Sequence, residues 1–410
     1  MHSVSPSRYL ARPMDSIYLD ACATTPLDPE VQALLVGHLQ SGHVNPSSQH
    51  QPGQRANRLI EDARQGIRDS LRIPRAAPLV LVSGGTEANN QAVFGACDGR
   101  PTERTSSLVV SAIEHPSILA AAGELERRDW EVRHLPVDSQ GVARVDQLES
   151  LLDCNTRLVS LMLVNNETGV IQPVGEAARI CAAHRIPLHC DAVQAVGKIP
   201  VHVDELVEAG VSLLTFSAHK IHGPRGIGGL ILAGPDVPWR PLLYGGYQQL
   251  GLRPGTEDVA LAAACELAVR KATGDLPDVA ARLAAMRDRL ESRILNEIPD
   301  AVVIGRGAPR APHCSNIGFP GHAAAAQIER QPLMLGCDMA GLAISTGSAC
   351  ASGSSEPSHV LQAMGIAPDL IDSSVRISFS RFNQEPEIDQ AVDRIIKVVK
   401  HLRQAKSARF

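Results

Sequence analysis

The stretch VSLLTFSAHKIHGPRGIGGLILAG, residues 211–234, contains two apolar runs of strand length separated by a polar segment. In both runs apolar residues follow one another with little alternation, which is typical of strands buried on both faces. Similar runs occur earlier in the chain, and helical stretches separate several of them; they cover residues 79–83, 108–113, 157–164 and 186–192. This order predicts an α/β domain, with a mostly parallel sheet covered by helices.

Helical periodicity extends the prediction to the rest of the chain. Residues 53–71, GQRANRLIEDARQGIRDSL, carry apolar side chains at the spacing of an amphipathic helix. We predict that the α/β domain covers residues 28–270. Beyond it lie a long helical stretch, short strand-like runs and a final helical stretch, at 276–298, 315–319, 375–380 and 388–405. We therefore predict a smaller α+β domain formed by residues 1–27 and 271–410.

The composition excludes several classes of protein. A chain of 410 residues is long enough for two domains. Aromatic residues make up 3% and the net charge is −5, which argues against nucleic acid as a direct ligand. No apolar run reaches the roughly 20 residues that span a membrane, and the N-terminus lacks a secretory apolar segment. The nine cysteines include no C-x-x-C pair, which predicts no metal site and a reducing, cytoplasmic compartment.

Polar residues follow five of the apolar runs at the end where each run stops. Ligands of open parallel sheets bind beyond the carboxyl ends of the strands. The residues there are Gly84-Gly85-Thr86, Glu114-His115, Asn165-Asn166-Glu167, Asp191 with Gln194, and Ser217-Ala218-His219-Lys220. Each is common as a cap, but together they predict one ligand site. Small residues at 84–86 suit a phosphate at a helix start, although a plain turn has the same composition.

Lys220 is the most informative of these residues, because only six of the 39 lysine and arginine residues are lysines. A lysine amine can form a Schiff base, whereas an arginine guanidinium does not deprotonate in proteins. The alternative is a solvated loop lysine. Lys220, a phosphate site and Asp191 together fit pyridoxal 5′-phosphate, with the carboxylate pairing the ring nitrogen and His115 over the ring. NAD is disfavoured, since GPRGIGG precedes a strand and lacks the G-x-G-x-x-G pattern.

Nine motifs occur in order along the chain: LDACATTPLD (19–28), NPSSQH (45–50), SGGTEANN (83–90), IEHPSIL (113–119), LVNNETGV (163–170), HCDAVQAVGKIPV (189–201), TFSAHKIHGPRGIGGL (215–230), RPGTED (253–258) and STGSACASGSSEPS (345–358). The chain resembles the cysteine desulfurases, which belong to the fold-type-I, class-V aminotransferase-like enzymes that use pyridoxal phosphate. That group has a large domain with a seven-stranded-type sheet. The long segment 345–358 resembles the cysteine loop of the subgroup whose members carry the cysteine on a mobile segment.

The resemblance implies a role for each motif residue around the cofactor. Lys220 would bind pyridoxal phosphate covalently, Asp191 would pair with the pyridinium nitrogen, and Gln194 would contact the phenolic oxygen. His115 would lie on the ring face. Five residues would hold the phosphate, the last of them reaching it from the other subunit of a homodimer: Gly85, Thr86, Ser217, His219 and Thr256.

The resemblance also implies a substrate site and a nucleophile. Asn166 and Arg376 would bind the carboxylate of L-cysteine, with Asn45 as a further candidate; a surface salt bridge is the alternative for Arg376. Cys350 would attack the substrate sulfur as a thiolate, giving L-alanine and an enzyme persulfide. A persulfide must leave the pocket to pass on its sulfur, which explains a cysteine among small, polar residues in 345–358. The alternative is an incidental loop thiol.

Two departures from the family pattern bear on the partners. Tyr247 and Gln249 stand where the family usually has Gly or His and then Glu, at the substrate entrance and the dimer contact. The C-terminus, HLRQAKSARF, lacks the aromatic tail that docks an iron–sulfur scaffold. The sulfur acceptor is therefore open between an iron–sulfur scaffold, a thiolation enzyme and a DNA-modification partner. The alternative function is a related pyridoxal-phosphate lyase, aminotransferase or selenocysteine lyase acting on another amino acid.

Overall fold

The computed structural model describes residues 16–42, 44–97, 106–234, 237, 239–321, 328–346 and 356–407. Cys350 and most of the predicted cysteine loop 345–358 lie outside the described residues, as do residues 1–15 of the predicted smaller domain.

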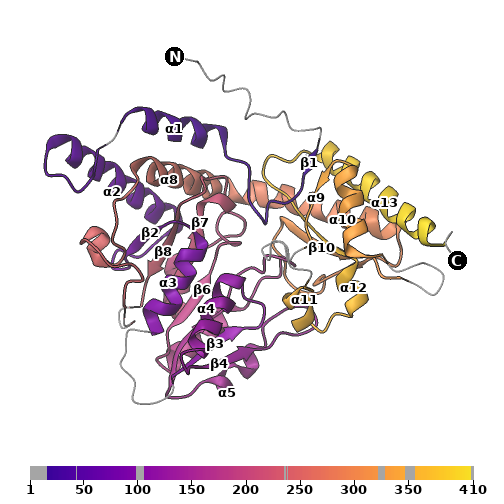
Figure 1. Ribbon diagram of the computed structural model, residues 1–410, viewed down its shortest axis with the longest axis horizontal. Helices are drawn as coiled ribbons and strands as arrows, with labels where there is room; N and C mark the ends of the chain where they lie inside the picture. Colours follow the sequence, from indigo (N-terminus) through magenta and orange to yellow (C-terminus); the bar gives the residue numbers. More distant parts are fainter. Residues whose placement is uncertain are drawn as a thin grey trace.

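A seven-stranded sheet forms the centre of the larger part of the molecule (Figure 1). Its strands, in spatial order, are β2 (Leu79–Val82), β8 (Gly228–Leu232), β7 (Val211–Ser217), β6 (Leu188–Asp191), β5 (Thr156–Ser160), β3 (Ser107–Ser111) and β4 (Glu131–Leu135). Only β8 runs antiparallel to its neighbours, β2 and β7, while the other pairs are parallel. The predicted α/β fold with a mostly parallel sheet is confirmed.

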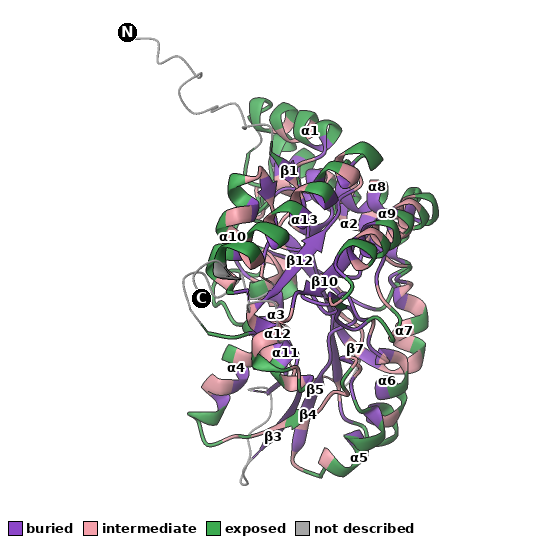
Figure 2. Ribbon diagram, turned by 90° about the vertical axis from the view of Figure 1, so that its right-hand side faces the viewer, coloured by how far each residue is buried: buried purple, intermediate pink, exposed green. Residues whose placement is uncertain are grey.

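Helices cover both faces of this sheet (Figure 2). One face carries α3 (Gly85–Cys97) and α4 (Pro116–Glu126), and the other carries α2 (Gln51–Leu71), α6 (Val174–Ala183), α7 (Val203–Ala209) and α8 (Val259–Gly274). Strand residues alternate between the two layers: Leu79 and Leu81 pack under α2, whereas Val80 and Val82 pack under α3. This is why the runs are apolar at consecutive positions. The helices α1 (Pro29–Gln40) and α5 (Leu148–Leu151) complete this part.

The second part of the molecule has its own core. The strands β9 (Val302–Val303), β10 (Cys314–Gly318) and β12 (Ser374–Ser378) form an antiparallel sheet, and β1 (Ile17–Tyr18) pairs with β11 (Leu342–Ala343). Its helices are α9 (Leu276–Glu297), α10 (Arg330–Met339), α11 (His359–Ala363), α12 (Pro368–Asp372) and α13 (Glu385–Ser407). Ile17 and Leu19 pack with residues from Leu283 to Val399, so both ends of the described chain meet in this core.

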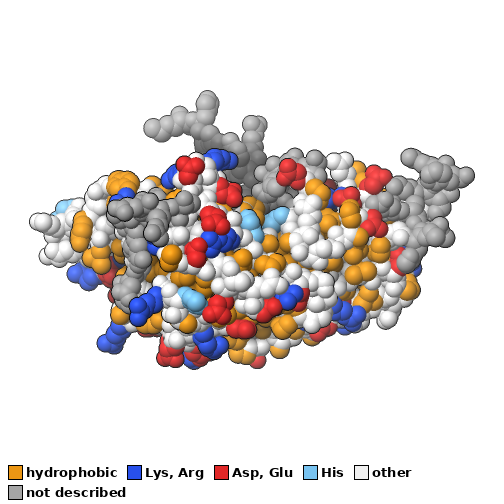
Figure 3. All heavy atoms as spheres, turned by 90° about the horizontal axis from the view of Figure 1, so that it is seen from below, with side chains coloured by type: hydrophobic (Ala, Val, Ile, Leu, Met, Phe, Trp, Pro, Cys, Tyr) orange, Lys and Arg blue, Asp and Glu red, His pale blue; other side chains and the backbone are white. Residues whose placement is uncertain are grey.

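The predicted boundary at residue 270 falls inside α8, which packs on α1 and α2 and ends at Gly274. The two cores separate between α8 and α9, and we retain the division into two domains as a proposal with its boundary moved to that junction. Within the described ranges, no helix is long and apolar enough to cross a membrane. Acidic and basic side chains are interspersed on the face seen in Figure 3.

Candidate active site

A cavity of about 480 Å³ lies at the carboxyl ends of the central strands. The chain brings nine of the predicted site residues together around it: Gly85, Thr86, His115, Asn166, Asp191, Gln194, Ser217, His219 and Lys220. They come from five separate strand ends, because parallel strands present their carboxyl ends at the same edge of a sheet.

Lys220 reaches into this cavity from one turn of 3₁₀ helix (Ala218–Lys220) that follows β7. Its side chain is buried, and Nζ donates to the carbonyl oxygens of Cys22, at 2.6 Å, and Ala23, at 2.7 Å. Both carbonyls belong to the segment that leads from β1 to α1. The amine is therefore a buried group that lines the cavity, and not the solvated loop lysine of the alternative interpretation.

Asp191 ends β6 and is held by two donors. Asn89 Nδ2 donates to its Oδ2 at 2.7 Å, and the backbone N–H of Val193 donates to its Oδ1 at 2.9 Å. Asn89 Nδ2 also donates to Ser117 Oγ at 2.9 Å, and all three side chains are buried. The carboxylate is thus fixed in one orientation, as a group that pairs with a ring N–H must be.

His115 caps the N-terminus of α4 and joins the same network. Its Nδ1 accepts from the backbone N–H of Ser117 at 3.1 Å and lies 2.8 Å from Ser117 Oγ. Burial lowers the pKa of the imidazole, although the charge of Asp191 partly opposes this effect. A neutral ring whose Nδ1 accepts carries its proton on Nε2, so His115 presents a flat, uncharged face.

One end of the cavity suits a phosphate. Gly84 has φ +149°, a conformation that favours glycine, and α3 begins at Gly85, where the first backbone N–H groups of a helix have no partner within the helix. Ser217 Oγ is buried and has no hydrogen-bond partner among the described residues. A neighbouring hollow of about 370 Å³ is lined by Thr86, Ser217, His219 and also by Arg225. Unfilled donors, a helix N-terminus and a cation fit the phosphate of pyridoxal phosphate.

His219 stands at this end as a neutral side chain. Its Nδ1 lies 3.1 Å from Thr24 Oγ1. Burial, with the nearby positive charge of Lys220, lowers its pKa to about 4. A neutral imidazole can serve as a hydrogen-bond donor without adding charge.

Arg376 lies on β12 directly behind the cavity wall. The side chain is buried, so the surface salt bridge of the alternative interpretation is wrong. Its Nη1 donates to the carbonyl oxygen of Asn166 at 3.0 Å, and its Nη2 pairs with Asp20 Oδ1 at 2.8 Å. Asn166 lines the cavity, whereas Arg376 is not among the residues that line it.

Besides Arg376, two further predicted residues that the structure describes, Asn45 and Thr256, do not line the cavity. Asn45 is exposed, and its Oδ1 accepts from the backbone N–H of Ser47 at 2.8 Å. Thr256 is exposed in the loop before α8. Cys350 lies outside the described residues. Their roles stay predictions.

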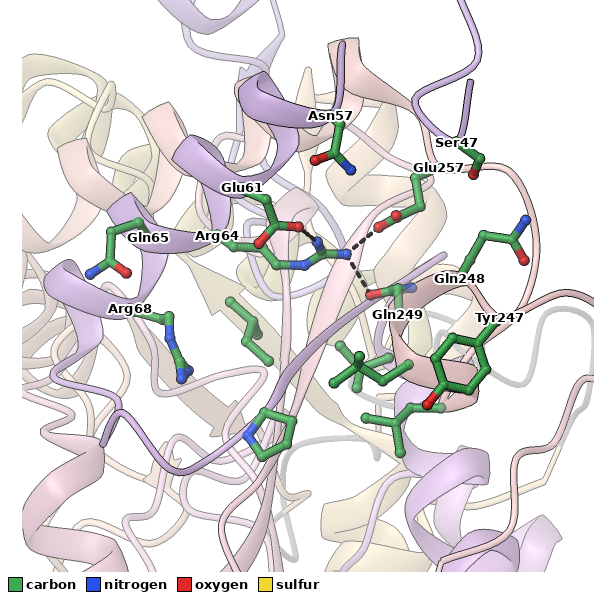
Figure 4. Close-up of a pocket in the computed structure, with 15 residues that line it drawn as sticks. Ser47, Asn57, Glu61, Arg64, Gln65, Arg68, Tyr247, Gln248, Gln249 and Glu257 are labelled. Carbon is green, nitrogen blue, oxygen red and sulfur yellow. Dashed lines mark hydrogen bonds and ion pairs between the residues drawn. The ribbon is translucent and has the colours of Figure 1, made fainter. Parts of the chain in front are cut away.

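The departures at Tyr247 and Gln249 lie at a second, larger cavity of about 650 Å³ between α2, β2 and the loop 241–258 (Figure 4). Gln249 pairs with the edge strand β2, since its Oε1 accepts from Leu81 N at 2.7 Å and its Nε2 donates to Leu81 O at 2.8 Å. Arg64 points toward the same amide and pairs with Glu61 and Glu257. A glutamate could not donate to Leu81 O, so the glutamine makes a contact that the usual residue cannot.

Sequence reasoning missed four residues of the site: Cys22, Asn89, Ser117 and Lys198. Asn89 lies one helical turn after Gly85, and Ser117 lies two residues after His115, so helical spacing could have indicated both. Cys22 contributes its carbonyl oxygen, which carries no sequence signal. Lys198 lies behind Gln194 and donates to it from Nζ at 2.6 Å.

The comparisons with known proteins agree with this geometry. The model of the family Aminotransferase class-V matches residues 17–391. A cysteine desulfurase of Enterobacter agglomerans is 39% identical over 394 residues, covering 95% of this chain and 94% of the relative. The solved structure of a NifS-like protein is 31% identical with a TM-score of 0.85, covering 94% of this chain and 100% of that one. A structure described as SspA in complex with cysteine is 29% identical with a TM-score of 0.76, covering 90% and 99%.

Both the extent of these matches and the cavity residues lead to one assignment. The family match spans more than half of the chain, and the Enterobacter agglomerans relative is aligned over nearly its full length. The chain belongs to the cysteine desulfurases, within the class-V aminotransferase family of pyridoxal-phosphate enzymes.

Proposed function

We propose that this cysteine desulfurase converts L-cysteine to L-alanine through Lys220 and Cys350, and leaves the sulfur on Cys350 as a persulfide. The observation that carries this proposal is the convergence of Lys220, Asp191 and His115 on one cavity with an open phosphate site. The structure described as SspA in complex with cysteine supports L-cysteine as the substrate.

We assign the cofactor contacts from this geometry. Lys220 would hold pyridoxal phosphate, with Asp191 at its ring nitrogen, His115 over its face and Gln194 at its phenolic oxygen. The phosphate would bind at the start of α3, through Gly85, Thr86, Ser217 and His219. Bound there, the cofactor supplies an electron sink that stabilises negative charge at the Cα of an amino acid.

The residues of the chain then divide the remaining work. Asn166 would bind the substrate carboxylate from the cavity wall, and Arg376, which lies behind Asn166 and pairs with Asp20, stays a candidate for the same role. The amine of Lys220 would take the Cα proton, since it is a buried amine that lines the cavity. Asn45 stays a further candidate for the carboxylate.

Cys350 would carry out the sulfur transfer. Its thiolate would attack the sulfur of bound L-cysteine, so that an S–S bond forms as the Cβ–S bond breaks. The electron pair stays on the carbon skeleton, which takes up protons and leaves as L-alanine. The persulfide would pass its sulfur to an acceptor protein, either an iron–sulfur scaffold or a thiolation enzyme, in the cytoplasm.

A homodimer would complete the site. Thr256 is exposed and does not line the cavity of its own chain, and exposed apolar side chains lie on the same loop: Leu242, Leu243, Tyr244, Tyr247 and Leu250. A second copy that covers this loop could receive Thr256 at its phosphate site.

The deciding experiment measures alanine and sulfide released from L-cysteine in the presence of a reductant. We expect equal amounts of both from the wild type and neither from Cys350→Ala, while Cys154→Ala, which alters an exposed thiol outside the cavity, keeps the wild-type rate. Full activity in Cys350→Ala would disprove its role as nucleophile. Activity only on another amino acid would favour the lyase, aminotransferase or selenocysteine lyase alternative.

A further inference from the structure

Lys198 is a buried lysine that the proposed reaction does not use. Only 7% of its surface is exposed, which is rare for a lysine. It follows Gly197, which has φ +69° and whose added Cβ would lie 2.7 Å from the Cβ of Ala272 on α8. The close approach of this turn to α8 directs the next side chain inward, toward Gln194.

Lys198 contacts the cavity through one residue. Its Nζ donates to Gln194 Oε1 at 2.6 Å, and Gln194 Nε2 donates to Cys22 O at 2.8 Å. An ammonium group has donors and no acceptor, so the amide must turn its oxygen toward Lys198. The amide NH₂ group then faces Cys22 O, with one of its two hydrogens left for another acceptor.

The position of the two side chains separates their roles. Gln194 lines the 480 Å³ cavity, whereas Lys198 is not among the described residues that line it. Lys198 therefore cannot replace Lys220 as the cofactor-binding amine, and it acts on the cavity only through Gln194 and through its charge.

Several charged or titratable groups surround the amine. Burial lowers the pKa of Lys198 to about 8; Lys220 and Arg376 act in the same direction, whereas the thiols of Cys22 and Cys314 oppose it. Its charge in turn contributes to the lowered pKa values of three histidines, His219, His222 and His313. At neutral pH the amine is mostly an ammonium group.

We propose that Lys198 is a positioning residue that holds Gln194 so that its N–H donates to the phenolic oxygen of pyridoxal phosphate. The inference rests on the proposed function, because it needs the cofactor to bind with its ring nitrogen at Asp191 and its phenolic oxygen at Gln194. The lysine adds a second effect, since a positive charge next to this oxygen favours its ionised form.

Two variants separate orientation from charge. Lys198→Met removes the donor and the charge but keeps the length of the side chain, and Lys198→Gln keeps a donor for Gln194 Oε1 without the charge. The first readout is the pH midpoint at which the visible absorption of the bound cofactor changes. We expect Lys198→Met to raise this midpoint by about half a pH unit or more, and Lys198→Gln to raise it less, because loss of positive charge and of the N–H donor favours the protonated chromophore.

The second readout is the dissociation constant of pyridoxal phosphate, measured in a double-mutant cycle with Gln194→Ala. We expect Lys198→Met to weaken cofactor binding about tenfold in the wild-type background and to have little effect in Gln194→Ala, because the amide through which it acts is gone. Circular dichroism of each apoprotein establishes that it is folded, and Lys198→Gln carries the test if Lys198→Met does not fold.

Two results would overturn the inference. The first is a Lys198 variant that keeps the wild-type midpoint and affinity; the second is a tenfold loss that persists in Gln194→Ala. Failure of the proposed function has a different signature, since the wild type itself would then bind no pyridoxal phosphate, or Lys220→Ala would retain the visible band and the activity.

Discussion

The cavity wall and the loop 241–258 are held in different ways. In the wall, Asp191, Asn89 and Ser117 are buried and bonded to one another within a single chain. In the loop, Tyr244 and Tyr247 are 82% and 79% exposed. The wall is complete in one chain, whereas the loop presents apolar side chains and Thr256 to the outside. We propose that the contacts to the cofactor ring come from one chain, whereas the contacts to its phosphate also need a second chain.

Among the variants of the cavity wall, we expect Lys220→Ala to lose the most activity. We expect alanine release to fall by about a thousandfold or more, because the variant loses both the amine that holds the cofactor and the base at Cα. Lys400→Ala is a suitable control, since this lysine pairs with Glu297 far along the chain on α9 and is about half exposed. A Lys220→Ala enzyme with more than a tenth of wild-type activity would contradict the proposed roles of Lys220 as the cofactor-binding amine and the base.

The folded state should lose stability in acid because of a buried histidine near the cavity wall. His189 on β6 is fully buried between Ser160 and Thr215, and burial lowers its pKa to about 4. The unfolded chain takes up this proton below about pH 6.5, so the folded state loses stability as the pH falls from 6.5 to 4, by roughly 3 kcal/mol from this group.

Urea unfolding at pH 7 and pH 4.5 measures this loss. His189→Gln should lose less stability between the two pH values than the wild type, because glutamine does not titrate. An equal loss of stability in the wild type and in His189→Gln would show that protonation of His189 does not destabilise the protein in acid.

Asn89→Ala tests how firmly the wall holds Asp191. We expect kcat to fall about ten- to a hundredfold, since a carboxylate that loses a hydrogen bond also loses its fixed orientation. The neighbour Asn90 is a matched control, because its Nδ2 donates to backbone oxygens of Thr86 and Ser117 and not to Asp191. Similar kcat values for Asn89→Ala and Asn90→Ala would show that Asn89 does not hold Asp191 in its orientation.

Thr256→Ala tests the loop. We expect pyridoxal phosphate to bind about tenfold more weakly, as for the loss of one hydrogen bond to a charged group. Mixed dimers sharpen the test: a chain with Lys220→Ala and a chain with Thr256→Ala should form one complete site per dimer. That site should bind pyridoxal phosphate with wild-type affinity. If it binds as weakly as the Thr256→Ala homodimer, Thr256 serves its own chain.

The smallest expected effect is that of Gln249→Glu at the base of the same loop. The carboxylate cannot donate to Leu81 O, so we expect the free energy of unfolding to fall by about 1 kcal/mol. Gln248→Glu is the control, because it makes the same replacement of an amide by a carboxylate at the adjacent residue. Thermal or urea unfolding of both variants decides whether the glutamine anchors the loop to β2.

Much of the fold and part of the site could be read from local sequence. The consecutive apolar residues of 79–82 and 211–217 predicted buried strands, and both are strands whose residues pack on two helical layers. Asp191 and Lys220 were found because each directly follows such a run. Parallel strands bring those positions to one edge without further information.

The remaining parts of the site depend on contacts between distant residues. Arg376 is buried against Asp20, 356 positions away, and Gln194 is bonded to Cys22, 172 positions away. A lysine in a turn carries no local signal of what it contacts, so Lys198 was missed, whereas helical spacing from Gly85 could have indicated Asn89. The layers and the polar residues at the strand ends could be predicted from local sequence, because consecutive apolar residues indicate buried strands and the polar residues directly follow those runs. Which side chains hold those residues in place depended on the tertiary fold, because contacts such as Asn89 with Asp191 and Arg376 with Asp20 join residues that are far apart in the chain.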